Sequence, residues 1–136
     1  MWTDSTLAAP PPTLRLDRAL ALVLAAALTT FAIAKISFGY HNGLEISRTT
    51  YYAATVIELA AAALFVARRH LLGAALTTGF FAVAIAYSMW SGVKACGCLG
   101  PVRLSSGEYR MIAATLGLLA TLLVHRRLQQ LPVATS

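Results

Sequence analysis

Residues 51–93, YYAATVIELAAAALFVARRHLLGAALTTGFFAVAIAYSMWSGV, contain two long apolar runs with three polar residues between them. The runs cover 51–67 and 71–93, and Arg68-Arg69-His70 separates them. Each run is close to the roughly 20 residues that a helix needs to cross the hydrocarbon core of a bilayer. Three residues leave room only for a tight turn. We therefore predict two antiparallel membrane-spanning helices that follow one another directly.

A third apolar run precedes this pair, over Ala19–Phe38, and only Lys35 interrupts it. A signal peptide is a competing interpretation, because Arg15 and Arg18 precede the run and Ala32-Ile33-Ala34 resembles a cleavage site. The run is long for the apolar region of a signal peptide, and further membrane runs follow it. We interpret it as a membrane-spanning helix.

The last apolar run, Met111–Val124, is the shortest. Ser105 and Glu108 before it match a capping box, which predicts a helix start near Ser106. The expected fold is an all-α antiparallel bundle of four transmembrane helices. Its predicted parts are a tail over 1–17, helices over about 15–38, 51–67, 71–94 and 106–126 within a membrane domain 18–128, and a second tail over 129–136.

Composition supports a membrane protein. Of the 136 residues, 58% are hydrophobic and only 12% are charged, about half the charged share of a soluble domain. A soluble domain of this length could not bury so much apolar surface in one core. The net charge of +6 does not indicate nucleic-acid binding, because the basic residues stand at the edges of apolar runs rather than in a stripe with aromatic residues.

The placement of basic residues predicts the orientation. With four spans, both termini and the turn at 68–70 share one side of the membrane. Basic residues on that side lie directly next to the ends of the apolar runs. Because basic residues next to membrane spans favour the cytoplasm, both termini are predicted to be cytoplasmic. These residues are Arg15, Arg18, Arg68, Arg69, Arg126 and Arg127.

Aromatic residues gather near the opposite, exoplasmic face. They fit either an interfacial belt or part of a ligand site. The set comprises Tyr40, Tyr51, Tyr52, Tyr87, Trp90 and Tyr109.

The two cysteines of the chain form the turn Cys96-Gly97-Cys98 on the predicted exoplasmic side. Gly97 gives the backbone the freedom that a disulfide across one residue requires. So small a ring is strained and readily reduced, which favours thiol–disulfide exchange. Lys94 nearby favours a thiolate. Three alternatives remain: a static bridge, two inert residues, or a soft-metal site for copper or mercury with His41 as a third ligand.

Glu58 interrupts the apolar sequence of its run. An ionisable residue inside a membrane indicates a functional site with a partner. Lys35 stands near the same end of the preceding helix, so we expect an ion pair between these two residues. The pair could handle protons or simply hold the bundle together.

The sequence resembles the MauE/DoxX group of small membrane proteins. The resemblance rests on Ala34-Lys35-Ile36, Ile57-Glu58-Leu59 and the turn Cys96-Gly97-Cys98-Leu99-Gly100, and it covers roughly residues 18–125. The turn is similar to the CxCFG signature of MauE, with Leu99 in place of the usual Phe. The resemblance implies a four-helix membrane protein that takes part in thiol–disulfide chemistry beside a thioredoxin-like partner, as MauE does in methylamine utilisation.

These observations lead to one hypothesis with two rivals. The hypothesis is a cell-membrane protein in which Cys96 and Cys98 exchange electrons with a thioredoxin-like exoplasmic protein, as a homo-oligomer or within a larger complex. A quinone near Tyr87 and Trp90, or a partner protein, would take the electrons onward. The rivals are a soft-metal binding or transport subunit and a non-catalytic assembly subunit.

Overall fold

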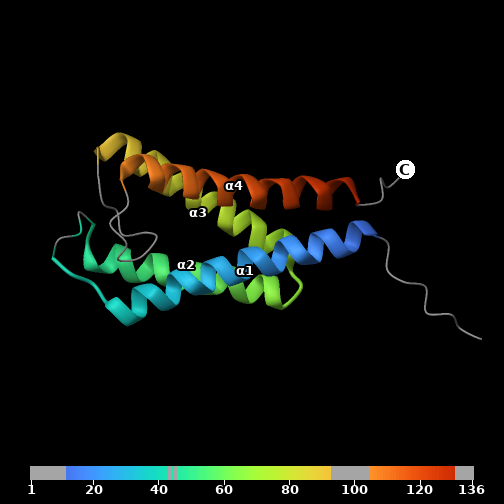
Figure 1. The fold of residues 1–136 in the computed structure, drawn as a ribbon, viewed down its shortest axis with the longest axis horizontal. Helices are drawn as coiled ribbons and strands as arrows, with labels where there is room; N and C mark the ends of the chain where they lie inside the picture. The colour runs from blue at the N-terminus through green and yellow to red at the C-terminus, as the bar shows by residue number, and fades with distance from the viewer. Residues whose placement is uncertain (1–11, 43, 45, 93–104, 131–136) are drawn as a thin grey trace, which may run out of the picture.

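The structure is a computed structural model that describes residues 12–42, 44, 46–92 and 105–130. The described residues are all-helical, without strands, which confirms the predicted fold class. Their four helices are each long and apolar enough to cross a membrane, with mean hydropathy between 1.4 and 2.1. The helices are α1 (Pro12–Phe38), α2 (Arg48–Val66), α3 (His70–Ser91) and α4 (Ser106–Gln129) (Figure 1).

The helices pack as two hairpins that form a ring. α1 packs closely against α2 and α3 against α4, α2 and α3 also touch, and α4 meets α1 over a smaller contact. The first and last described residues lie at the same end of the bundle (Figure 1). We call this the Asp17 end, where α1 and α3 begin and α2 and α4 end. The other is the Lys35 end, where α1 and α3 end and α2 and α4 begin.

The bundle exposes many large apolar side chains and buries several polar ones. Val56, Val83 and Met111 are each at least 65% exposed, whereas Thr55, Thr77 and Ser88 are buried. Many alanines complete the interior, which lets the helix backbones approach closely. A surface of this kind belongs in lipid, because in water its exposed apolar side chains would drive association. The protein is accordingly a multi-pass membrane protein.

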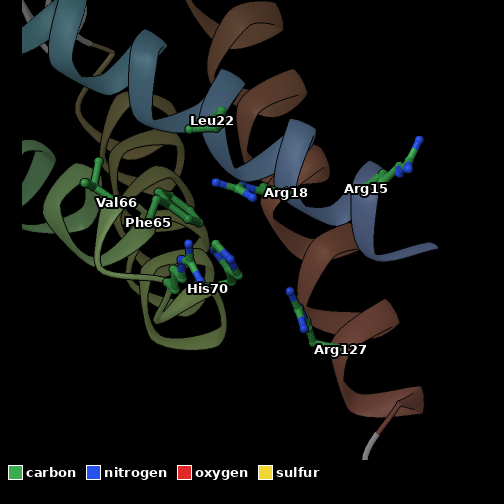
Figure 2. A pocket seen from close by; sticks show the side chains of 8 residues that line it. Arg15, Arg18, Leu22, Phe65, Val66, His70 and Arg127 are labelled. Carbon is green, nitrogen blue, oxygen red and sulfur yellow. The ribbon is translucent and has the colours of Figure 1, made fainter. Parts of the chain in front are cut away.

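The turn between α2 and α3 is as tight as predicted, with only residues 67–69 outside the helices. The Arg69 amide donates back to the Leu64 carbonyl at 2.9 Å, and Arg68 takes a left-handed conformation with φ of 62°. Glycine usually occupies this position after a helix, because a side chain is strained there. Phe65 and His70 stand on either side of the turn (Figure 2). An arginine is therefore held in the turn against its backbone preference.

Most helix boundaries differ from the ends of the apolar runs, and three of the differences have a clear local cause. α2 begins at Arg48 rather than 51, because the Ser47 side chain caps it by accepting from the Thr50 amide at 3.1 Å. α1 begins at Pro12, since proline at the first helical position loses no hydrogen bond. α3 ends at Ser91, before Gly92 with φ of 65°. Apolar runs mark the part of a helix that lies in lipid, whereas capping residues mark its ends.

The predicted capping box at the start of α4 is confirmed. The Glu108 amide donates to Ser105 Oγ at 3.3 Å, and the Ser105 amide donates to Glu108 Oε2 at 2.8 Å. We expect Ser105→Ala to lower the free energy of unfolding by about 1 kcal/mol, because the Glu108 amide loses its acceptor and the Glu108 carboxylate loses the Ser105 hydroxyl. Unfolding in mixed micelles measures this. Ser105→Asp should behave like the wild type, and an equal loss in both variants would contradict the capping role.

Candidate functional site

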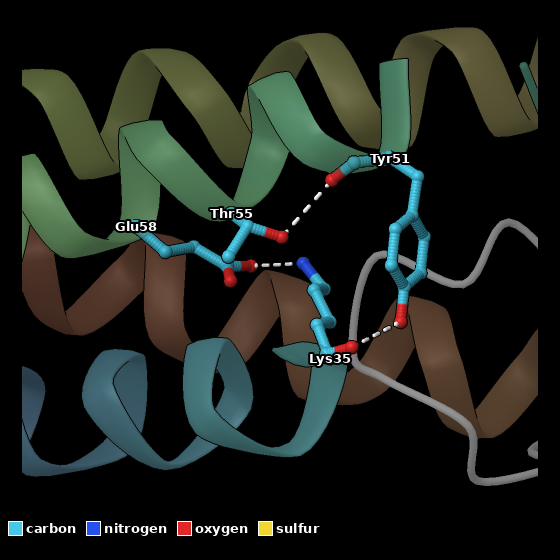
Figure 3. Close-up of polar contacts among 4 residues, drawn as sticks. All are labelled: Lys35, Tyr51, Thr55 and Glu58. Atoms are coloured by element: carbon cyan, nitrogen blue, oxygen red, sulfur yellow. Dashed lines mark hydrogen bonds and ion pairs between the residues drawn. The ribbon is translucent and has the colours of Figure 1, made fainter. Parts of the chain in front are cut away.

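The expected ion pair between Lys35 and Glu58 is present. Lys35 Nζ lies 2.6 Å from Glu58 Oε1, and the two side chains are 1% and 0% exposed. Lys35 belongs to the last turn of α1 and Glu58 to the middle of α2, about 15 Å from the start of that helix by helical rise. Figure 3 shows the lysine side chain extending from α1 into the bundle to meet the carboxylate. The pair therefore joins the two helices of the first hairpin within the membrane core.

Tyr51 holds the backbone of Lys35 in place. Its hydroxyl donates to the carbonyl oxygens of Lys35 and Gly39, at 3.2 and 3.4 Å. Gly39 has φ of 68°, and its amide donates to the same Lys35 carbonyl at 2.9 Å. Thr55 Oγ1 donates to the Tyr51 carbonyl at 3.0 Å (Figure 3). These hydrogen bonds connect the end of α1 to the start of α2 next to the ion pair.

A second tyrosine, Tyr40, makes contacts with described residues between α1 and α2. Tyr40 donates to the Ile46 carbonyl at 3.0 Å and meets the Tyr51 ring edge-on, with centroids 5.8 Å apart. His41 is exposed, and its carbonyl accepts from the Leu44 amide at 3.2 Å. The imidazole therefore stands at the surface of the Lys35 end, where a ligand or partner could reach it.

The aromatic residues divide into two groups. Trp90 is 95% exposed and Tyr87 is 50% exposed on the last turns of α3, as expected at a lipid interface. Tyr51 and Tyr109 are only 1% and 7% exposed. Two of the five tyrosines therefore pack inside the bundle and not in an interfacial belt, because their rings fill the space between helix ends.

The cysteine turn lies outside the described residues, together with Lys94. Its neighbours on the chain are described: Gly92 ends α3 with a left-handed backbone, and Ser105 caps α4. Both helix ends belong to the Lys35 end of the bundle. Within the described part of the chain, no cluster of three His, Cys, Asp or Glu could hold a metal ion. The soft-metal hypothesis concerns Cys96 and Cys98, which this finding does not include.

Asp17 is a second buried charge on α1, besides Lys35, and it was not predicted from the sequence. It is 0% exposed near the start of α1 and accepts from Arg126 Nε at 2.9 Å and from the Gln130 side chain at 3.2 Å. Arg127 Nε lies 3.6 Å away. Helical spacing contains the missed signal, since Asp17 shares one stripe with Ala21, Leu24, Leu28 and Lys35, all of which are buried.

The two buried charges fix α1 to different neighbours at its two ends. Lys35 binds α2 at one end, and Asp17 binds α4 at the other. Each is paired with an opposite charge, so both ion pairs hold helices of the bundle together. Comparison of the chain with protein-family models, curated proteins and solved structures finds no match.

Proposed function

We propose that this chain is a membrane thiol–disulfide redox protein of the MauE/DoxX type that acts through Cys96 and Cys98. The supporting observation is where the cysteine segment is attached. Residues 93–104 join the end of α3 to the start of α4, and both ends lie at the Lys35 end of a rigid membrane bundle. A pair of cysteines one residue apart, in a segment that joins two helix ends at one end of the bundle, is a candidate for exchange with a partner from the aqueous side.

The proposed reaction is a balanced exchange of two electrons. A thiolate of a thioredoxin-like partner attacks one sulfur of the Cys96–Cys98 disulfide, and the other sulfur leaves as a thiolate. The second thiol of the partner then resolves the mixed disulfide. The partner leaves oxidised, and this chain retains the dithiol. A quinone or a further protein disulfide accepts two electrons and two protons from that dithiol to restore the starting state.

The charge distribution supports an exoplasmic position for the cysteines. All six arginines predicted to be cytoplasmic belong to the first turns of α1, the α2–α3 turn or the last turn of α4, so they share the Asp17 end. Basic residues next to membrane spans favour the cytoplasm. We therefore assign the Asp17 end to the cytoplasm and the Lys35 end to the periplasmic or extracellular side, where disulfides persist.

The proposal is tested by trapping. We expect Cys96→Ser or Cys98→Ser to hold a thioredoxin-like exported protein in a mixed disulfide. The remaining thiolate attacks the disulfide of the oxidised partner in the reverse direction of the exchange, and the second cysteine of this chain that would release the partner is missing. Non-reducing electrophoresis of membranes followed by mass spectrometry identifies the captured protein. The double variant Cys96→Ser/Cys98→Ser is the matched control and should capture nothing. Failure of both single variants to capture any thiol protein would refute the proposal.

Mass spectrometry of the intact protein separates redox from metal binding. A disulfide adds two daltons on reduction, whereas a soft-metal site gives a metal adduct that thiol alkylation removes. A membrane-impermeant maleimide, applied to intact cells after mild reduction, should label Cys96 or Cys98. Labelling only after cell lysis would reverse the proposed orientation.

A further inference from the structure

A hollow of about 500 Å³ opens at the Asp17 end, between α1, α4 and the α2–α3 turn. Four arginines and a histidine line it, on three separate parts of the chain. Figure 2 shows Arg18 and Arg127 reaching from α1 and α4 towards the turn at His70, whereas Arg15 extends outward. The hollow thus gathers positive charge from segments far apart in the sequence.

Most of this charge has no acidic partner. Asp17 lies beneath the hollow and pairs with Arg126 and Arg127. Arg18 and Arg68 form no ion pair with any described residue. His70 Nδ1 is buried and makes no hydrogen bond within the described part of the chain. Positive charge from the arginines therefore faces the hollow in excess of what the described residues neutralise.

Two backbone features strengthen the positive field. α3 begins at His70, which lines the hollow, so the positive end of its dipole lies beside the hollow. No side chain caps this helix start. Arg68 holds its left-handed φ of 62° in the turn, where glycine would avoid the strain. A strained arginine beside an uncapped helix start is a costly arrangement for folding alone, and it suits the binding of an anion.

One side of the hollow is apolar and continues into the lipid-facing surface. Phe65 forms its buried floor, while Leu22 and Val66 are 56% and 70% exposed. A free phosphate would meet only the arginines, whereas a phospholipid would also cover these two side chains with its acyl chains. The arrangement of cations at the bundle end and apolar side chains towards the membrane matches both parts of a lipid.

We propose that this hollow binds the phosphate of an anionic phospholipid. Arg18 and Arg68 donate to the phosphate oxygens, the start of α3 stabilises its charge, and the acyl chains lie along Leu22 and Val66. Basic hollows between membrane helices on the cytoplasmic side bind such headgroups. The site is independent of the cysteine pair, and it would anchor the bundle to the inner leaflet.

Native mass spectrometry of the full chain in detergent, titrated with phosphatidylglycerol, tests the proposal. We expect Arg18→Gln/Arg68→Gln to bind this lipid roughly tenfold or more weakly than the wild type, because each lost charge weakens attraction to the anionic headgroup. Arg48→Gln, which removes the same charge from an exposed position at the opposite, Lys35 end of the bundle, should change the affinity by less than about threefold. Phosphatidylcholine should bind the wild type more weakly than phosphatidylglycerol.

Two further experiments separate lipid binding from misfolding and from binding of free phosphate. Arg68→Gly removes the charge and also relieves the turn, so it should lose lipid affinity while remaining folded by circular dichroism. Unchanged phosphatidylglycerol affinity in this variant and in a folded Arg18→Gln variant would overturn the proposal. Displacement of the lipid by millimolar inorganic phosphate would overturn the lipid assignment in favour of a soluble phosphate ligand.

Discussion

Glu58→Gln should lower the free energy of unfolding by about 3–5 kcal/mol, because it leaves the Lys35 ammonium buried without its counter-charge. Lys35 is only 1% exposed and its nitrogen lies 2.6 Å from the carboxylate, so water cannot replace the lost partner without opening the bundle. Lys35→Met should cost a similar amount, since it leaves the Glu58 carboxylate alone. Reversible unfolding in mixed micelles with increasing dodecyl sulfate measures both losses.

The double variant Lys35→Met/Glu58→Gln separates the ion pair from general damage. It leaves no unpaired buried charge between α1 and α2, so it should recover most of the stability lost in either single variant. Arg48→Gln is a matched control, because Arg48 is an exposed cation on the first turn of α2. It should change stability by about 1 kcal/mol or less. Additive losses in the double variant would contradict a direct interaction between Lys35 and Glu58.

The same variants distinguish a structural pair from a functional one. A pair that only holds the hairpin together predicts that Lys35→Met/Glu58→Gln, once folded, still captures the thiol partner when combined with Cys98→Ser. Proton handling during electron transfer predicts that capture still succeeds, because the trapping step needs no proton from the membrane core. It also predicts that Lys35→Met/Glu58→Gln with both cysteines intact fails to reoxidise. The redox state of Cys96 and Cys98 in membranes after a pulse of reductant reports this difference.

The helices could be predicted because lipid imposes a length and a composition on every span. The short run Met111–Val124 is the instructive case: its apolar part is only the middle of α4, and the capping box at Ser105 located the start correctly. The Lys35–Glu58 pair was also predictable, because an ionisable residue in lipid needs a partner and these two stand near the same bundle end. The structure confirms the contact, and the capture and reoxidation experiments above distinguish proton handling from a purely structural role.

Asp17 and Arg68 could not be found from apolar runs. Asp17 precedes the first run, so it resembled a surface charge, although its spacing from Ala21 and Leu24 puts it on the buried stripe of α1. The left-handed backbone of Arg68 depends on how α2 and α3 pack, and nothing in the residue type indicates it. The basic hollow therefore emerged only from the three-dimensional arrangement, whereas the cysteine hypothesis rests on sequence.

The cluster of Asp17, Arg126 and Arg127 should lose more stability when the two arginines are replaced than when the aspartate is replaced. Asp17 is 0% exposed, whereas the side chains of Arg126 and Arg127 are 28% and 26% exposed. Arg126→Gln/Arg127→Gln strands a buried carboxylate and should cost about 3–5 kcal/mol of unfolding free energy. Asp17→Asn frees two arginines that can turn towards water, and it should cost only about 1–3 kcal/mol.

The test is whether the double-arginine variant loses more stability than Asp17→Asn. Both losses are measured in the same mixed-micelle unfolding experiment. Adding Asp17→Asn to the double-arginine variant should restore much of its stability, because the stranded charge disappears. Arg15→Gln/Arg69→Gln removes two exposed arginines from the same bundle end and should cost about 1 kcal/mol or less. A larger loss for Asp17→Asn than for the double-arginine variant would mean that the arginines, and not the carboxylate, are the groups that the bundle shields from water.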